Sequence, residues 1–283
     1  MEMLKDILQA STMTNSLTIN EDEEYMKNGV IYCKKCNTPR ETTIFLTGHP
    51  RRVRCNCDCM TADYERMLEE QRKRERQMQL DNLRVNSLIG KRYHNARFDK
   101  CDLSNESFKK AWSRCKKYCE VSDIVLDNGY GIYLFGKSGT GKTHLMACMC
   151  NELLSHMKQC LFTNFLEISK SLRATYSSRT ETEEKLIDRI CDIDYLFIDD
   201  IGTERLTSNG DDNWMQEKVY DIINKRYNDK KPTVFTSNYS LAELVNERGM
   251  MDKTVDRMLE MSNAILKIEG NSHRSIRDRD IPF

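Results

Sequence analysis

The sequence predicts an α/β fold, with a parallel sheet covered by helices on both faces and a small metal-binding domain before it. Three observations lead to this prediction. A phosphate-binding motif, GKSGTGKT, lies between an apolar strand-like run and a run of helical periodicity. Further apolar runs then alternate with helical segments, which is typical of a parallel sheet. Upstream, closely spaced cysteines have the spacing of zinc ligands.

Residues 136–143 match the G-x-x-x-x-G-K-[ST] loop that binds a nucleotide triphosphate. Its glycines let backbone N–H groups turn toward phosphate oxygens, and the following helix adds its positive N-terminus. We expect Lys142 to contact the β- and γ-phosphates and Thr143 to hold Mg²⁺. The expected nucleotide-binding residues are Gly136, Lys137, Ser138, Gly139, Thr140, Gly141, Lys142, Thr143 and His144.

Length and composition limit the class of protein. A chain of 283 residues can hold one domain of about 200 residues and a smaller one. Basic and acidic residues number 44 each, so nucleic-acid binding would need a local patch. The N-terminus lacks the apolar core of a signal peptide, and no run approaches the ~18 apolar residues of a membrane span. We therefore expect a cytoplasmic protein without a membrane partner, whose twelve cysteines are metal ligands and buried thiols.

Changes in composition divide the chain into four parts. These are a polar N-terminal segment (1–32), a zinc-binding domain (33–59), a helical linker (60–88) and a nucleotide-binding domain (89–283). In the first part, Met1, Leu4, Ile7 and Leu8 have helical spacing. This spacing fits either a fraying helix in a partly disordered terminus or a helix that binds a partner.

The second part contains five cysteines. They are Cys33, Cys36, Cys55, Cys57 and Cys59. Two close pairs separated by a loop suit tetrahedral Zn²⁺, and metal binding would supply the folding energy that so short a segment lacks. We expect Cys33 and Cys36 to pair with Cys57 and Cys59, leaving Cys55 unused, while His49 is a weaker candidate. The site is expected to be structural, and a cluster of ordinary thiols is the alternative.

The third part is charged and contains neither glycine nor proline. Glu69 with Lys73, and Glu70 with Arg74, form pairs four residues apart that stabilise a helix. The segment therefore predicts a solvated helix between two domains. A basic stripe that binds nucleic acid is the alternative interpretation.

The fourth part contains five candidate strands. They are residues 131–135, 160–164, 194–198, 233–237 and 264–268. Segments such as FLEISKSLRATY and EKVYDIINKRYND lie between them and have helical periodicity. The interval between Lys142 and Asp199 leaves room for a helix, a strand and a second helix. This favours ATPases with an additional central strand over simple nucleotide kinases.

Acidic and polar residues follow two of these strands. The run DYLFIDD ends in Asp199, which would hold Mg²⁺ directly or through water, and Asp200. Many such ATPases have a Glu at the second position to polarise the attacking water, so the shorter Asp200 implies slow hydrolysis. Glu204 is a second candidate for that role. Asn238, after TVFTS, would sense the γ-phosphate, although an Asn after a strand is also a common turn residue.

In this order, GKSGTGKT, FIDDIGTER, PTVFTSN, TVDRM and SHR resemble the motifs of AAA+ ATPases of the DnaC/DnaI type. These are replicative helicase loaders, some of them phage-encoded, within the IstB-like ATP-binding superfamily. The resemblance covers roughly residues 90–283, and a cysteine-rich N-terminal domain also resembles that of DnaI-like and phage loaders. It implies a five-stranded parallel sheet and subunits assembled around nucleotide. It also implies that Arg257 is an arginine finger for the neighbouring subunit's ATP and that Arg274 contacts phosphates.

The resemblance implies an ATP-dependent loader that places a DnaB-type helicase on single-stranded DNA, with ATP, Mg²⁺ and Zn²⁺ as cofactors. Its expected partners are that helicase, single-stranded DNA and other copies of the chain. The sequence stops soon after Arg274, so we expect no substantial helical lid. An IstB-type transposition helper is the nearest alternative. A non-hydrolysing, nucleotide-responsive DNA-binding adaptor also stays open because Asp200 replaces Glu, whereas a small-molecule kinase has no support.

Overall fold

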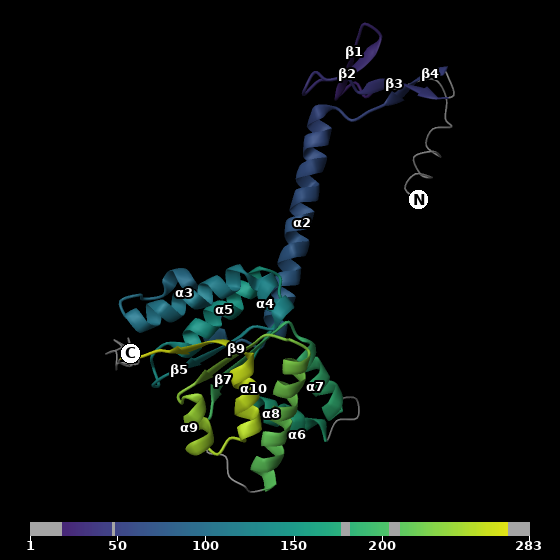
Figure 1. Cartoon of the computed structure of the whole chain (residues 1–283). Coiled ribbons are helices and arrows are strands. Elements are labelled where there is room, and N and C mark those ends of the chain that lie inside the picture. The colour runs from purple at the N-terminus through teal and green to yellow at the C-terminus, as the bar shows by residue number, and fades with distance from the viewer. Residues whose placement is uncertain (1–18, 47–48, 177–181, 204–209, 271–283) are drawn as a thin grey trace, which may run out of the picture. The chain divides into compact units, whose positions relative to one another are not determined.

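The computed structural model describes residues 19–46, 49–176, 182–203 and 210–270. The chain forms two compact units, Met1–Arg76 and Gln77–Phe283, called here the N-terminal and C-terminal units (Figure 1). Helix α2 (Asp58–Asn86) crosses the boundary between them. The helix expected at the extreme N-terminus lies outside the described residues.

Two hairpins form the sheet structure of the N-terminal unit. Strand β1 (Glu24–Lys27) pairs antiparallel with β2 (Val30–Cys33), and β3 (Glu41–Leu46) with β4 (His49–Arg54). Asn28 and Gly29 connect β1 to β2 with φ of 54° and 77°, as a two-residue turn of the primed type requires. This hairpin was not predicted, because residues 24–32 share the polar composition of the N-terminal segment. The Asn-Gly pair was the signal for it.

A buried carboxylate connects the hairpins of this unit. Glu24 is 4% exposed and pairs with Arg40 at 2.9 Å and with Arg54 of β4 at 2.6 Å. Burial alone would raise the pKa of Glu24, but the Asn20 backbone and the two arginines outweigh burial and lower it. Because the unit buries few apolar side chains, this ion-pair cluster and the cysteines described below hold it together.

The C-terminal unit contains a sheet of five parallel strands. They are β5 (Gly131–Phe135), β6 (Cys160–Asn164), β7 (Tyr195–Ile201), β8 (Thr233–Ser237) and β9 (Ser262–Lys267). Their order across the sheet is β6-β7-β8-β5-β9, and every neighbouring pair is parallel. The predicted five-stranded parallel sheet is therefore confirmed. Strand β7 extends further than expected, through both acidic residues that follow the apolar run.

Helices cover both faces of the sheet (Figure 1). On one face lie α3 (Glu106–Glu120), α4 (Ser122–Asn128) and α5 (Lys142–Ser155); on the other lie α6 (Phe165–Thr175), α7 (Glu183–Asp192), α8 (Gly210–Asn228), α9 (Leu241–Asn246) and α10 (Asp252–Met261). Strand side chains alternate between these layers, so Phe197 joins the first core while Leu196 and Ile198 join the second. Two short 3₁₀ turns, η2 (Lys91–Tyr93) and η3 (Phe98–Lys100), precede α3.

One charged side chain is fully buried in the second core. Arg226 of α8 donates to the carbonyl oxygens of five residues and to the Thr233 hydroxyl. Those carbonyls belong to the end of α7 and to the residues that lead into β7 and β8. Burial lowers the pKa of Arg226 to about 10, so it stays charged at neutral pH. It therefore fixes where two central strands begin.

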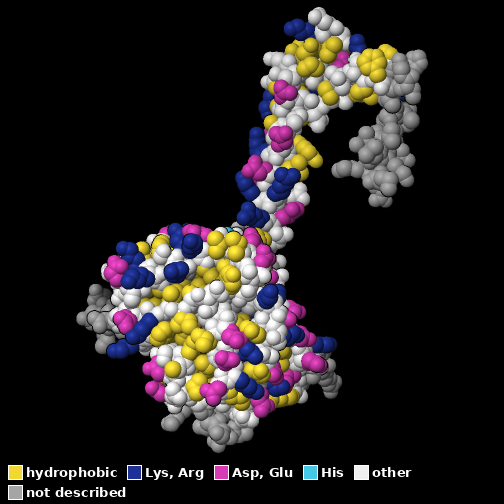
Figure 2. Space-filling view, viewed as in Figure 1, with side chains coloured by type: hydrophobic (Ala, Val, Ile, Leu, Met, Phe, Trp, Pro, Cys, Tyr) yellow, Lys and Arg dark blue, Asp and Glu magenta, His cyan; other side chains and the backbone are white. Residues whose placement is uncertain are grey.

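Helix α2 buries none of its side chains. The expected pairs are present, with Glu69–Lys73 at 2.9 Å and Glu70–Arg74 at 3.9 Å. Lys, Arg, Asp and Glu side chains are interspersed along it in Figure 2, which favours the solvated helix over a basic stripe. Within the described ranges, no helix combines the length and apolar character that crossing a membrane requires.

Candidate functional site

The P-loop, residues 136–143, connects β5 to α5. Gly136, Gly139 and Gly141 have φ of 145°, 84° and 96°, values that favour glycine. A Cβ on Gly136 would lie 2.1 Å from the Ile268 carbonyl oxygen, so the backbone approach also excludes a side chain there. Gly141 is the N-cap of α5 and supplies no side-chain cap. The first N–H groups of the helix are thus oriented for an anion, as the motif predicts.

Lys142 is held at the centre of this loop. It is 4% exposed, and its Nζ donates to the carbonyl oxygens of Gly136 at 2.8 Å and Lys137 at 2.9 Å. It also donates to Oδ1 of Asn238 at 3.0 Å. The structure therefore places Asn238, at the end of β8, beside the P-loop lysine. A γ-phosphate bound by Lys142 would lie next to the Asn238 amide.

Asp199 lies opposite the start of α5. Its Oδ1 accepts hydrogen bonds from Thr143 Oγ1 at 2.9 Å and from Thr236 Oγ1 at 2.5 Å. Burial raises the pKa of Asp199, and the Asp200 carboxylate adds to this rise, although both hydroxyls oppose it. A carboxylate next to a threonine hydroxyl is the donor set that Mg²⁺ takes beside a nucleotide. Thr143 and Asp199 thus fit the expected metal site.

Asp200 differs from Asp199 in exposure and in backbone conformation. It is exposed and has a φ of 54°, and its backbone N–H donates to Thr236 Oγ1 at 2.9 Å. The single hydroxyl of Thr236 therefore fixes both aspartates. Glu204, the second candidate for positioning water, lies outside the described residues.

Two cavities open beside these groups. One, of about 200 Å³, is lined by P-loop residues together with Arg92, Tyr93, His144, Asp200 and Asn238. The other, of about 220 Å³, is lined by Asn164, Phe165, Leu166, Asp199, Asp200, Gly202, Thr203 and Met250. Asp200 lines both cavities. It is therefore in position to act on a water molecule beside a phosphate in the first.

Three residues of the site were not predicted. Arg92 and Tyr93 line the P-loop cavity from η2, and nothing local in their sequence indicates a ligand. Thr236 holds Asp199 and Asp200 from β8. A hydroxyl residue in the apolar run TVFTS was its only signal.

Of the two predicted arginines, only Arg257 falls within the described residues, and it does not line the P-loop cavity. Arg257 of α10 pairs with Glu260 at 2.6 Å and donates to Asn224 at 3.2 Å. Its guanidinium also lies 4.7 Å from the ring centroid of Tyr227 in α8. These contacts hold the Arg257 side chain against α8 and outside the P-loop cavity of its own chain. This position is compatible with action on a neighbouring subunit. Arg274 lies outside the described residues.

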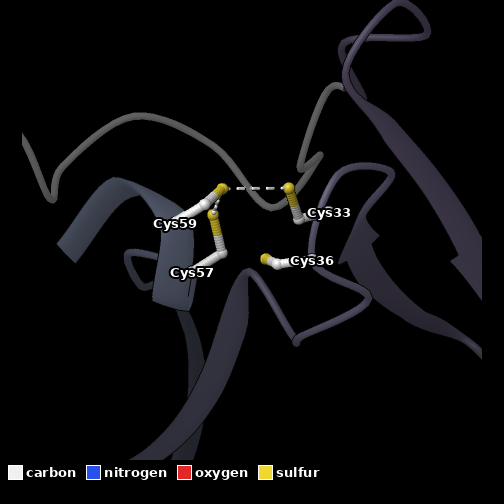
Figure 3. A group of neighbouring side chains, drawn as sticks. All are labelled: Cys33, Cys36, Cys57 and Cys59. Carbon is white, nitrogen blue, oxygen red and sulfur yellow. Dashed lines mark hydrogen bonds between the residues drawn. The ribbon is translucent and has the colours of Figure 1, made fainter. Parts of the chain in front are cut away.

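In the N-terminal unit, the structure brings together the four cysteines chosen from the sequence: Cys33, Cys36, Cys57 and Cys59 (Figure 3). Their sulfur atoms all lie within 4.8 Å of one another. Cys59 Sγ is 3.6 Å from that of Cys33 and 3.2 Å from that of Cys57. Cys55 contacts the Pro39 carbonyl oxygen instead, and the side chain of His49 lies outside the described part.

The protonation chemistry of this cluster suits a cation. A hydrogen bond with Thr38 lowers the pKa of Cys36 to about 5. A hydrogen bond with Cys57 and, to a smaller extent, burial raise the pKa of Cys59 to about 12. Thiols this close cannot all ionise without a positive charge among them, and Zn²⁺ supplies that charge. The four sulfur atoms therefore fit a tetrahedral structural zinc site.

Comparison with known families and proteins agrees with this geometry. The family described as IstB-like ATP binding protein matches residues 60–280. The replicative helicase loader DnaC of Escherichia coli (strain K12) is 27% identical over 184 residues, which cover 65% of this chain and 71% of DnaC. The replicative helicase loader DnaI of Bacillus subtilis (strain 168) is 26% identical over 277 residues, covering 91% of this chain and 83% of DnaI.

Solved structures give the same result for the fold. A crystal structure of the DnaC helicase loader superposes with a TM-score of 0.54 and 26% identity, covering 64% of this chain and 100% of that one. The replication initiator DnaA bound to AMPPCP and single-stranded DNA has a TM-score of 0.53 at 20% identity, covering 65% and 52%. At that identity the second likeness shows the shared fold alone.

Proposed function

The chain belongs to the family of IstB-like ATP-binding proteins, and from this premise we propose that it is an ATP-dependent loader of a DnaB-type replicative helicase. The observation that supports this most is that Lys142 and Thr143 line one cavity, while Asp199 accepts a hydrogen bond from Thr143 at its edge. The named relatives DnaC and DnaI are helicase loaders. The expected setting is the cytoplasm, where the chromosome is replicated.

The residues of the cavity divide the work of ATP hydrolysis. Lys142 and the P-loop N–H groups would hold the phosphates, while Thr143 and Asp199 would hold Mg²⁺. Asn238 would sense the γ-phosphate through the side chain that now accepts from Lys142. Asp200 would orient the attacking water. Because its carboxylate is on a shorter side chain than Glu, we expect slow turnover that partners stimulate.

ATP would control assembly and DNA affinity. Arg257 would leave its ion pair with Glu260 and contact the ATP of an adjacent subunit, so that self-association completes the site. The ATP-bound assembly would hold single-stranded DNA, and hydrolysis would release the loader. Such a switch needs only a few kcal/mol of differential affinity between its two states.

The N-terminal unit, with zinc held by its four clustered cysteines, would bind the helicase. Phe45 is 76% exposed on β3, and an exposed aromatic side chain is a typical interface anchor. We expect Phe45→Ser to weaken co-elution with the helicase at least tenfold. Val85→Ser, at a residue 74% exposed in the C-terminal unit, is the matched control and should leave co-elution unchanged. Equal binding by both variants would place the helicase contact elsewhere.

The proposal is tested by measuring ATP hydrolysis with the host's ring helicase and single-stranded DNA, added separately and together. A loader forms a complex with the helicase, and its turnover changes when the partners are added. Absence of a complex, together with stimulation by duplex DNA and a transposase, would favour the second candidate, an IstB-type transposition helper. The matched family is described as IstB-like ATP binding protein.

A third candidate is a nucleotide-responsive adaptor that does not hydrolyse ATP. The observation that favours it is Asp200 at the position of the water-polarising Glu. Asp200→Glu distinguishes the two, because a slow ATPase should become faster with the longer carboxylate. An adaptor would bind ATP and DNA with no turnover in either form.

A further inference from the structure

A second group of metal-ligating side chains lies in the C-terminal unit, apart from the cysteines of the hairpins. It consists of Cys101, His144 and Cys148, whose ligand atoms all lie within 4.8 Å of one another. Cys101 follows η3, whereas His144 and Cys148 lie one turn apart on α5. The tertiary fold therefore brings together two thiols and an imidazole from separate parts of the sequence.

The distances in this cluster are those of a tetrahedral centre. Two Zn–S bonds of about 2.3 Å at a tetrahedral angle put their sulfur atoms about 3.8 Å apart. The Sγ atoms of Cys101 and Cys148 are 3.9 Å apart. A disulfide would need the same two atoms at about 2.05 Å and an oxidant as well, so the present geometry suits a bridging cation better.

The surroundings also suit a bound ion. Cys148 is 1% exposed, whereas Cys101 and His144 are half-buried, so the cluster is shielded yet open on one side. His144 lines the P-loop cavity, which gives an ion a route from solvent. Two helical ligands four residues apart on one face match a common arrangement of zinc ligands.

We propose that Cys101, His144 and Cys148 bind a divalent cation of borderline softness, with Zn²⁺ as the best match, and leave a fourth position for water. Thiolate and imidazole ligands select zinc over magnesium or calcium. The ion connects the segment before α3 to the first turn of α5. Because His144 follows Thr143 directly, the bound ion holds the helix turn that carries the magnesium ligand.

The test is the metal content of the full-length chain, loaded with Zn²⁺ under reducing conditions and freed of excess ion, measured by mass spectrometry. Wild type is expected to hold two equivalents, and Cys101→Ser and Cys148→Ala one each. Cys150→Ala is the matched control, since Cys150 is also buried on α5, and it should retain two. Loading with Co²⁺ should show that Cys101→Ser loses a charge-transfer band about half as intense as that of a four-thiolate site.

The result that overturns the proposal is equal metal content in wild type, Cys101→Ser and Cys150→Ala. A Cys101–Cys148 disulfide in the intact mass, without the loss of a metal equivalent in Cys101→Ser, also overturns it. The difference of one metal equivalent between wild type and Cys101→Ser does not depend on the hairpin cysteines. If the hairpin cysteines bind no zinc, wild type should hold one equivalent and Cys101→Ser none, and the proposal still stands.

Discussion

At the scale of single residues, Asp199 is where stability and chemistry oppose each other most directly. Its carboxylate is partly buried, and burial raises its pKa. A buried acid with a raised pKa destabilises the folded chain above that pKa, because the unfolded chain ionises it more easily. The same charge would attract Mg²⁺ at the proposed metal site. The residue is therefore costly to the fold in the absence of a cation.

We expect Asp199→Asn to raise the melting temperature of the nucleotide-free protein by a few degrees at neutral pH. The Asn side chain retains an oxygen that can accept from Thr143 and Thr236 and carries no charge. The penalty on wild type shrinks as the pH falls below the folded pKa and is gone below the unfolded pKa of about 3.9, so the two melting temperatures should converge as the solution is acidified toward that value. Calorimetry measures both temperatures. The exposed Asp200→Asn is the control, and a lower melting temperature for Asp199→Asn would contradict this account.

In the P-loop cavity, Lys142 is the residue proposed to contact the phosphates. Lys142→Ala should weaken binding of a fluorescent ATP analogue by about 100-fold or more, because one or two charged hydrogen bonds of about 1.5–3 kcal/mol each are lost. Lys110→Ala, which removes an exposed lysine of α3, should bind as wild type does. Helicase binding by the N-terminal unit should persist in Lys142→Ala. Loss of both activities from this one change would contradict two separable units.

Residues within one motif could be predicted from the sequence, because their spacing already carries their geometry. Lys142 and Thr143 lie in a fixed pattern, and Asp199 ends an apolar run that must lie in the sheet. Arg92 and Tyr93 could not be predicted, because only the packing of η2 against the P-loop brings them to the cavity. The cluster of Cys101 with α5 was missed for the same reason.

At the scale of elements, ion pairs and clustered cysteines connect the two hairpins, where an apolar core would otherwise do so. Their few buried apolar side chains include Ile31, Cys33 and Cys57. Short apolar runs between helical segments predicted all five strands of the larger sheet, but no helical segment separates β1 from β2. Their turn and the buried Glu24 define them instead. Hydrophobic periodicity therefore predicts strands poorly in a unit that clustered cysteines and ion pairs stabilise in place of an apolar core.

Removing zinc should therefore unfold the hairpins while leaving the C-terminal unit folded. Cys36→Ser, or treatment with a strong chelator, is expected to expose the segment before α2 to limited proteolysis. Nucleotide binding by Cys36→Ser should stay within about twofold of wild type. Cys55→Ser is the matched control, since Cys55 lies outside the cluster, and it should stay resistant. Equal cleavage of the two variants would contradict the ligand assignment.

At the scale of the whole molecule, one chain brings together most residues of the proposed ATPase site, whereas Arg257 of α10 packs against α8. Its ion pair with Glu260 and its contact with Tyr227 hold it there. Assembly would supply this guanidinium from the neighbour. The turnover of ATP per subunit should then rise with protein concentration. It would stay constant in an ATPase whose site is complete in one chain.

Arg257→Ala should retain ATP binding but lower turnover in the assembled state by about tenfold or more, and Arg257→Lys should not restore it. Glu260→Gln is the matched variant, because it frees the arginine from its ion pair and should leave turnover equal or higher. Hydrolysis is measured across a range of protein concentrations. Unchanged turnover in Arg257→Ala at the highest concentration would reject the finger role.

The most direct test of the proposed function is the transfer of a DnaB-type helicase onto closed circular single-stranded DNA, which has no end for a ring to thread. Helicase retained on the circle is measured after gel filtration at high salt. Retention should require this chain and ATP, should fail with Lys142→Ala, and should fall with Phe45→Ser. Equal retention of helicase with and without the chain would contradict the loader function.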